Sequence, residues 1–167
     1  MSWSYKWGKN EVREYLRSKF KGNAKVLDIG AGCGTYWELL HNDFKTIDAV
    51  EVFKPNIEKF KLKQKYHRVY NMNIKDFKYG NYDIIIFGDI IEHLEVEEAQ
   101  EVLKYASNRC KEIIVAVPYE LEQDEVEGNI HEIHKQSDLT PKIMKERYPM
   151  LKELYKNDLY GYYVKGD

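Results

Sequence analysis

A glycine-rich segment near the start of the chain constrains the fold more than any other feature. Residues 26–36 read VLDIGAGCGTY, so an apolar run ends in an acidic residue and a G-x-G-x-G turn follows. An apolar run, a tight glycine turn and a helix-compatible stretch together predict a strand, a loop and a helix N-terminus. Such a junction is suited to a nucleotide-like ligand, because backbone N–H groups and missing side chains let the ligand approach closely.

The spacing of the glycines separates two classes of nucleotide-binding loop. Dinucleotide-binding loops have the pattern G-x-G-x-x-G, which would place the third glycine at position 35. That position holds Thr35, and the third glycine is Gly34. The pattern resembles the first motif of the class I S-adenosylmethionine-dependent methyltransferases, in which an acidic residue precedes a G-x-G-x-G turn. A nicotinamide-dependent oxidoreductase stays as a less favoured alternative.

Helical and strand patterns alternate along the rest of the chain. Val12, Tyr15, Leu16 and Phe20 predict the apolar stripe of an opening helix. We expect strands at 24–29, 46–51, 68–74, 82–87 and 112–117, and helices at 35–41, from Pro55 to about 63, at 96–110 and from Thr140 to about 148. Two closing strands, 152–155 and 160–164, are joined by a short connection and must therefore be antiparallel.

This order of elements predicts an α/β fold. We expect a three-layer αβα sandwich around a doubly wound, mostly parallel sheet that ends in an antiparallel strand pair. The resemblance covers the chain from about position 9 to its end, and it implies a Rossmann-like methyltransferase fold with strand order 3-2-1-4-5-7-6. With 167 residues, the chain is expected to be one domain, 1–167.

The composition limits which partners and which cellular compartment we expect for this chain. The net charge is -2 and acidic residues are interleaved with the lysines, so nucleic acid is an unlikely partner. Cys33 and Cys110 form neither a metal-type pair nor a disulfide framework. No apolar leader and no apolar run long enough to span a bilayer occur, so a cytoplasmic protein is expected, with no membrane partner. The oligomeric state cannot be predicted.

Ligands of a doubly wound sheet bind at the carboxyl ends of its strands, so the residues there are the candidates for the cofactor site. The resemblance implies that S-adenosyl-L-methionine is the cofactor. The expected cofactor-binding residues are Asp28, Gly30, Gly32, Gly34, Glu51, Phe53, Asn73, Ile74 and Asp89.

Individual roles within this set can be assigned from side-chain chemistry. A carboxylate at Glu51 can accept both ribose hydroxyls, and Phe53 could pack on the adenine face or simply in the core. Asp28 could orient a ligand ammonium or accept loop N–H groups. Asn73 stands where the family often has an aspartate, but an amide oxygen can still accept from the adenine amino group. The resemblance places Asp89 beside the methionine part of the cofactor.

Three histidines are the catalytic candidates: His134, His131 and His93. In the fold that the resemblance implies, the loop after the fifth strand, here 120–136, faces the transferred methyl group. A neutral imidazole there can accept the proton that the nucleophile loses on methylation. Some members of the family that the chain resembles have a histidine just before the helix that follows the fifth strand. His134 fits that position better than His131. His93 lies in a segment, DIIEHL at 89–94, that closely resembles the Asp-x-x-Glu-His segment of small-molecule methyltransferases. Helix N-terminal chemistry is the alternative reading of its Glu92 and His93.

A metal site is the sharper alternative for these residues. Asp89, Glu92, His93 and one or both loop histidines resemble the Glu-x-x-Glu-His arrangement, completed by a distant histidine, of small-RNA 2′-O-methyltransferases. The first acid here is an aspartate, and no basic domain for RNA is evident. We therefore expect a mechanism without a metal.

The sequence predicts a methyltransferase that moves the methyl group of S-adenosylmethionine to a small-molecule, or exposed macromolecular, nucleophile. A catalytically silent cofactor-binding module is an alternative from a different functional class. The aromatic residues Trp3, Tyr5 and Trp7 could form a lid over the cofactor or pack on a hydrophobic surface. Neither the acceptor nor the acceptor atom can be predicted.

Overall fold

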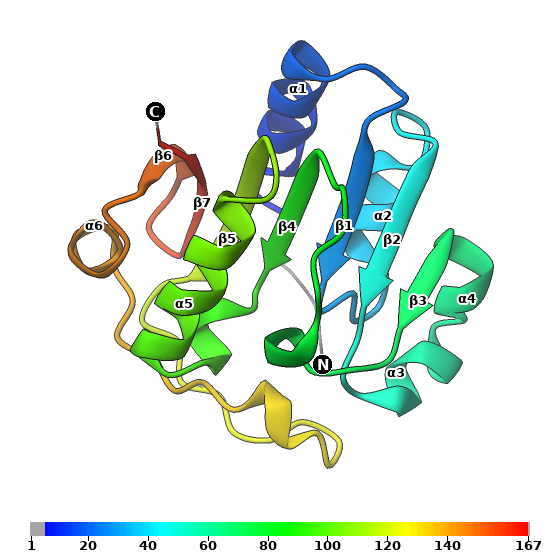
Figure 1. The fold of residues 1–167 in the computed structure, drawn as a ribbon. Helices are drawn as coiled ribbons and strands as arrows, with labels where there is room; N and C mark the ends of the chain where they lie inside the picture. The colour runs from blue at the N-terminus through cyan, green and yellow to red at the C-terminus, as the bar shows by residue number, and fades with distance from the viewer. Residues whose placement is uncertain (1–5, 167) are drawn as a thin grey trace.

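The structure, a computed structural model, describes residues 6–166. Its strands form a seven-stranded sheet in the order β3-β2-β1-β4-β5-β7-β6 (Figure 1). The strands are β1 Lys25–Ile29, β2 Thr46–Val50, β3 Arg68–Tyr70, β4 Ile84–Gly88, β5 Glu112–Pro118, β6 Leu151–Lys156 and β7 Tyr160–Lys165. The α-helices are α1 Lys9–Lys19, α2 Thr35–Leu40, α3 Lys54–Lys59, α4 Leu62–Lys65, α5 Val96–Ser107 and α6 Pro141–Arg147. The short 3-10 helices are η1 Ile74–Asp76, η2 Ile91–His93 and η3 Ile130–Glu132.

The predicted fold class and strand order are confirmed. Strands β1 to β5 pair in parallel, and β7 pairs antiparallel with both β5 and β6. The strand order reverses at β1 and β4, which places a topological switch point at their carboxyl ends.

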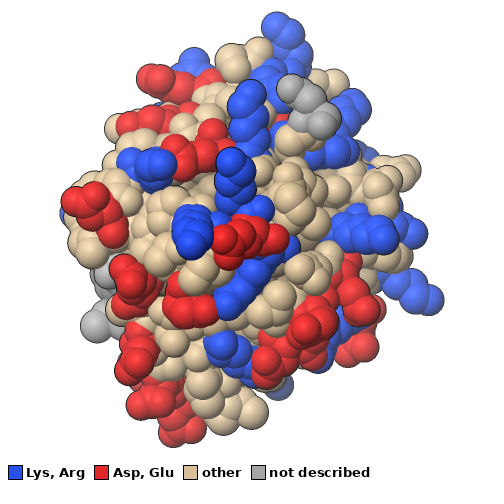
Figure 2. Space-filling view, turned by 90° about the vertical axis from the view of Figure 1, so that its left-hand side faces the viewer, with Lys and Arg blue, Asp and Glu red and all other residues tan. Residues whose placement is uncertain are grey.

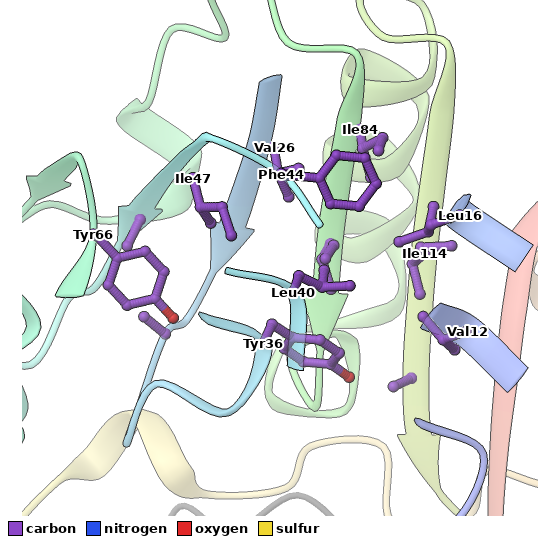
Figure 3. Packing of buried hydrophobic residues seen from close by; sticks show 14 of the residues in the cluster. Val12, Leu16, Val26, Tyr36, Leu40, Phe44, Ile47, Tyr66, Ile84 and Ile114 are labelled. Atoms are coloured by element: carbon purple, nitrogen blue, oxygen red, sulfur yellow. The ribbon is translucent and has the colours of Figure 1, made fainter. Parts of the chain in front are cut away.

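Two hydrophobic clusters pack on opposite faces of the one sheet. Alternate residues of each strand point to opposite faces, so Ile84 and Ile86 join one cluster while Ile85 and Phe87 join the other. Helices α1 and α2 cover the first face, where Val12, Leu16, Tyr36 and Leu40 are buried against the strands (Figure 3). Helices α5 and α6 cover the second face.

Two expected elements are corrected by the structure. The third strand was expected at 68–74, but β3 ends at Tyr70, because its neighbour β2 ends at Val50 and offers no further pairing. The Asn71 side chain instead donates to the backbone oxygens of residues 51 and 52, and η1 follows. The helix expected from Pro55 to about 63 is split into α3 and α4, because Lys61 is left-handed with φ 52°.

The loop between β5 and α6 lies below the carboxyl ends of the strands (Figure 1). It is therefore placed to cover the switch point. On the side of the molecule that carries β6 and α6, basic and acidic side chains are interleaved and form no extended field of one sign (Figure 2). This face agrees with the expected solvated surface. Among residues 6–166, no helix is long and apolar enough to cross a membrane.

Candidate active site

A cavity of about 490 Å³ opens at the carboxyl ends of the central strands. Its wall runs from the glycine loop after β1 to the loop 120–136 after β5. Most of the predicted site residues line it: Gly30, Gly32, Glu51, Asn73, Ile74, Asp89, His93, His131 and His134. The cavity thus brings the predicted cofactor side and the predicted reacting side together in one place.

The glycine loop needs its glycines for conformational reasons. Gly30, Gly32 and Gly34 all have positive φ, at 68°, 50° and 90°. A side chain at Gly30 would also overlap Ile90, which lines the cavity. Gly34 does not line the cavity; it closes the turn by donating its N–H to the oxygen of Ala31 and precedes α2. Its role is thus to shape the loop.

Glu51 is a buried carboxylate on the cavity wall, at 4% exposure. Its Oε2 accepts from the Gly32 N–H at 2.8 Å, and its Oε1 accepts from the Phe53 N–H at 2.8 Å. Burial raises the pKa of Glu51, while these backbone hydrogen bonds act in the opposite direction. A side-chain hydrogen bond from Asn56 acts in the same direction as the two backbone bonds, and a carboxylate has about four acceptor positions, so one is left for a ligand donor. The carboxylate therefore couples the glycine loop to the end of β2.

Asp28 lies behind the cavity wall instead of on it. It is fully buried in β1, and its Oδ2 accepts from the hydroxyl of Tyr66. Its other oxygen has no hydrogen-bond partner among the described residues. Burial raises the pKa of Asp28 to about 7, although the Tyr66 hydrogen bond lowers it and nearby Glu51 raises it further. Asp28 accepts no N–H group of the glycine loop, contrary to one of its two expected roles.

Of the remaining cofactor-side candidates, three line the cavity and one, Phe53, does not. Asn73 and Ile74 line it, and the Asn73 Oδ1 caps η1 by accepting from the Lys75 N–H at 3.0 Å. Phe53 does not line the cavity and caps α3 through its backbone. Asp89 lines the cavity in a left-handed conformation with φ 55°, and its Oδ1 accepts from the Tyr160 hydroxyl at 2.7 Å.

Glu92, His93 and His134 converge at the reacting side of the cavity. One carboxylate oxygen and one nitrogen of each ring all lie within 4.8 Å of one another. The two imidazole rings meet edge to face with centroids 4.7 Å apart. Asp89 is not part of this group of three, although the sequence alternative included it. Glu92 and His93 lie on the short η2, with Glu92 in its first turn, and not at the N-terminus of α5, which begins at Val96.

The hydrogen bonds of the two rings indicate which nitrogen carries the proton in each. His134 Nδ1 lies 2.7 Å from the oxygen of Leu121, and His93 Nδ1 lies 3.3 Å from the oxygen of Ile133. A carbonyl oxygen can only accept, so Nδ1 carries the proton in each neutral ring and Nε2 keeps its lone pair. Both carboxylate oxygens of Glu92 are buried without a hydrogen-bond partner among the described residues.

The electrostatics of this cluster follow from its burial. Desolvation, with a further contribution from Asp89, raises the pKa of Glu92 well above its usual range. Desolvation, and then the neighbouring His134, lowers the pKa of His93 to about 4. Three acceptors without a donor are mutually unfavourable unless a proton or a cation lies between them.

The remaining candidates are placed less centrally. His131 lines the cavity but is exposed and lies outside the cluster of three. Trp7 is 42% exposed and does not line the cavity, while Trp3 and Tyr5 lie outside the described residues. Sequence reasoning missed several wall residues contributed by loops, among them Met72, Ile90, Leu121, Gln123 and Asn129. Their positions depend on loop conformation, for which the sequence carries no periodic signal.

The family assignment comes from a match over residues 27–112, just over half of the chain, to the family described as a methyltransferase domain. The matched region contains the glycine loop, Glu51 and the Asp89–His93 segment. The chain therefore belongs to this family and is a class I S-adenosylmethionine-dependent methyltransferase. Among curated proteins, none matches the sequence.

Solved structures share the fold at low sequence identity. A S-adenosylmethionine-dependent methyltransferase from Clostridium acetobutylicum is 14% identical, with a TM-score of 0.71 and coverage of 98% of this chain and 92% of that one. The methyltransferase domain of bacterial CtHen1 is 21% identical, with a TM-score of 0.67 and coverage of 95% and 97%. Magnesium protoporphyrin IX methyltransferase from Synechocystis, with bound S-adenosylhomocysteine, is 11% identical, with a TM-score of 0.66 and coverage of 93% and 80%.

Proposed function

We propose that this protein methylates a small-molecule nucleophile in the cavity described above, with the whole chain acting as one domain. Supporting one domain, both hydrophobic clusters pack on the same sheet. Supporting a small acceptor, the cavity wall is completed by the loop 120–136, without an inserted substrate domain. The observation that carries the proposal is that His134 and the glycine loop line one and the same cavity.

The residues on the cofactor side fit S-adenosylmethionine, which supplies an electrophilic methyl group on a sulfonium. The glycine loop leaves room for the ligand at Gly30 and Gly32, where side chains are absent and φ is positive. Glu51 would accept from a ribose hydroxyl at its remaining acceptor position. Asn73 and Ile74 would contact the adenine, and Asp89, held by Tyr160, would lie beside the methionine part.

His134 would act as the general base in this proposal. Its Nδ1 proton is committed to the oxygen of Leu121, so Nε2 holds the lone pair that can accept a proton. Nε2 would accept the proton that the nucleophile loses on methylation, while the bound cofactor would supply the methyl group and keep the electron pair of the broken carbon–sulfur bond. Positioning in the cavity would supply much of the remaining acceleration.

A matched pair of histidine variants tests this role. His134→Ala should lower turnover by about 10²–10⁴-fold, the usual contribution of a general base, and leave the affinity for S-adenosylhomocysteine nearly unchanged. His131→Ala is the control, since His131 lies on the same wall but outside the cluster. Turnover can be followed by mass spectrometry of methylated acceptors from a panel of hydroxyl and amine compounds. Normal turnover by His134→Ala would remove His134 from the mechanism.

A second candidate mechanism uses a divalent cation, and the donor-free cluster favours it. Two imidazole nitrogens and one carboxylate are a ligand set for divalent transition metals, manganese among them. Each imidazole is oriented through Nδ1 by a backbone carbonyl, as metal-ligating histidines usually are. A cation between Glu92, His93 and His134 would offset the buried charge of Glu92 and polarise an acceptor oxygen. This ligand geometry is the observation that supports the second candidate mechanism.

Chelation separates the two mechanisms. If the base mechanism holds, exhaustive chelation leaves methyl transfer intact. If the cation mechanism holds, activity is lost to the chelator and restored by Mg²⁺ or Mn²⁺, and Mn²⁺ binding followed by electron paramagnetic resonance disappears in Glu92→Gln. His131→Ala should bind Mn²⁺ like the parent. A protein that binds S-adenosylhomocysteine but transfers no methyl group under either condition would be a cofactor-binding module instead.

A further inference from the structure

The three groups of the cluster come from two chain segments, and no hydrogen bond between their side chains is present. Glu92 and His93 follow β4, whereas His134 belongs to the loop after β5. The carboxylate oxygens of Glu92 accept no hydrogen bond from either ring, and the rings meet only edge to face. One link between the segments is the contact of His93 Nδ1 with the oxygen of Ile133, the residue before His134, and bonds outside the three side chains complete the placement of His134.

Gln136, two residues after His134, connects these segments. Its side chain is 3% exposed, and its Nε2 donates to the oxygen of Ile91 at 2.8 Å and to that of Leu94 at 3.0 Å. These two carbonyls flank Glu92 and His93 along the chain. The backbone N–H groups of Lys135 and Gln136 both donate to the oxygen of Glu92, at 2.8 and 3.0 Å. The end of the loop is thereby fastened to η2 and the residue after it.

The other end of the same amide is fastened to α6 and the residue that follows it. Its Oε1 accepts from the Tyr148 hydroxyl at 2.8 Å and from Arg147 Nη1 at 3.1 Å. Arg147 is itself fixed by an ion pair with Asp138. Both donors and both acceptor positions of the Gln136 amide are thus used, which allows a single orientation of the side chain. No hydrophobic side chain and no carboxylate could make this set of bonds.

We propose that Gln136 is a positioning residue that sets the placement of His134 against Glu92 and His93. The inference rests on the proposed function of that cluster, but it concerns the geometry and holds for either mechanism. A displacement of about 1 Å at a catalytic group lowers rates by up to about 100-fold. Loss of the amide should therefore lower turnover without weakening cofactor binding, because Gln136 does not line the cavity.

The test compares Gln136→Leu with Gln100→Leu. Gln100 is a matched control: its Nε2 donates to the oxygen of Arg147 at 2.8 Å and joins α5 to α6, but it bonds to neither η2 nor the loop. Three quantities are measured in each variant: the nuclear Overhauser contact between the His93 and His134 rings, turnover, and the dissociation constant for S-adenosylhomocysteine. The chain has five histidines, so the ring signals can be assigned by substitution.

Gln136→Leu should lose the ring contact and lower turnover by about 10–100-fold, with the dissociation constant within about twofold of the parent. Gln100→Leu should keep all three. Retention of the contact and of turnover in Gln136→Leu, or an equal loss in Gln100→Leu, would overturn the proposal. If Gln136→Leu does not fold, Tyr148→Phe replaces it and removes one acceptor-side bond; a weaker ring contact supports the proposal and an unchanged one overturns it.

This design keeps two failures apart. If the parent transfers no methyl group to any acceptor, the proposed function fails, whereas the ring contact still decides the role of Gln136. If turnover is present and the ring contact is indifferent to Gln136, the proposed function stands and the positioning role fails.

Discussion

Two backbone N–H groups hold the Glu51 side chain on the cavity wall. A glutamine has nearly the same shape, so substituting it removes the negative charge with little change of shape. In Glu51→Gln, one carboxylate oxygen becomes a donor that opposes a backbone N–H or a ribose hydroxyl. We expect S-adenosylhomocysteine affinity to fall by about 1–3 kcal/mol, measured by titration calorimetry. Glu58→Gln, on exposed α3 nearby, is the control. An affinity unchanged within twofold would remove Glu51 from the ribose site.

Gly32 tests the same wall through its backbone. It lines the cavity with φ 50°, a conformation that a β-branched residue rarely adopts. Gly32→Val should abolish binding of S-adenosylmethionine, because the side chain fills the space for the ligand and strains the loop. Neither the parent nor the variant should bind NAD in the same calorimeter. Tight NAD binding that survives the substitution would contradict the cofactor assignment.

Asp28 gives a pH dependence of stability with a definite sign. Its pKa is raised from 3.8 to about 7 in the folded protein, so between about pH 4 and 7 the folded state binds more protons than the unfolded state. The free energy of unfolding therefore falls as pH rises through that window. Asn cannot ionise but can still accept from Tyr66, so Asp28→Asn should lose this fall and be more stable than the parent at pH 8. Urea unfolding at pH 5 and pH 8 measures both, and a variant penalised more at pH 8 would refute the assignment.

At the scale of elements, strong periodicity made most of the fold predictable. Buried strands such as β4 and amphipathic helices such as α5 were found because their apolar spacing is long and regular. The end of β3 could not be predicted, since it depends on where its partner β2 stops. The break at Lys61 was also missed, because a lysine carries no sequence signal for a left-handed conformation.

Helix α6 depends on its N-cap, because seven residues make few internal hydrogen bonds. The Thr140 hydroxyl accepts from the Ile143 N–H at 3.2 Å, and Pro141 begins the helix. Thr140→Ala should lower the free energy of unfolding by about 1 kcal/mol, measured by urea titration. Thr140→Ser keeps the hydroxyl and should recover most of the loss; equal losses in both variants would show that the methyl group, and not the cap, matters.

At the scale of the whole molecule, the sequence predicted the location of the site better than the hydrogen bonds that connect its residues to the rest of the fold. The carboxyl-end rule brought Gly30, Glu51, Asp89 and His134 to one cavity from separate strands. It could not show that Asp28 lies behind the wall or that Asp89 is turned to Tyr160, because these depend on side-chain packing between distant elements. The fastening of His134 by Gln136 was likewise invisible, since a glutamine has no motif of its own.

An ion pair joins α3 to the loop 120–136. Lys59 of α3 lies 2.6 Å from Glu127 at the tip of the loop 120–136, and both side chains are at least half exposed. Exposed pairs contribute about 0–1 kcal/mol, so Glu127→Lys should speed S-adenosylhomocysteine release by about two- to fivefold, measured by stopped-flow. The exchange Lys59→Glu with Glu127→Lys should restore the parent rate. If the exchanged protein releases the ligand as fast as Glu127→Lys does, the ion pair does not control ligand release.

Residues 121–134, the middle of this loop, are bonded mainly to one another, and this bears on how acceptor preference could change. The His134 N–H donates to the oxygen of Gln123 at 2.9 Å, and the Gln123 amide donates to the oxygen of Glu132 at 2.7 Å. A residue pair at 126 and 129 closes its tip. A segment organised in this way keeps its shape when exposed residues such as Ile130 are replaced. New acceptors can therefore be selected by substitution within this one segment, while the wall that holds the cofactor stays untouched.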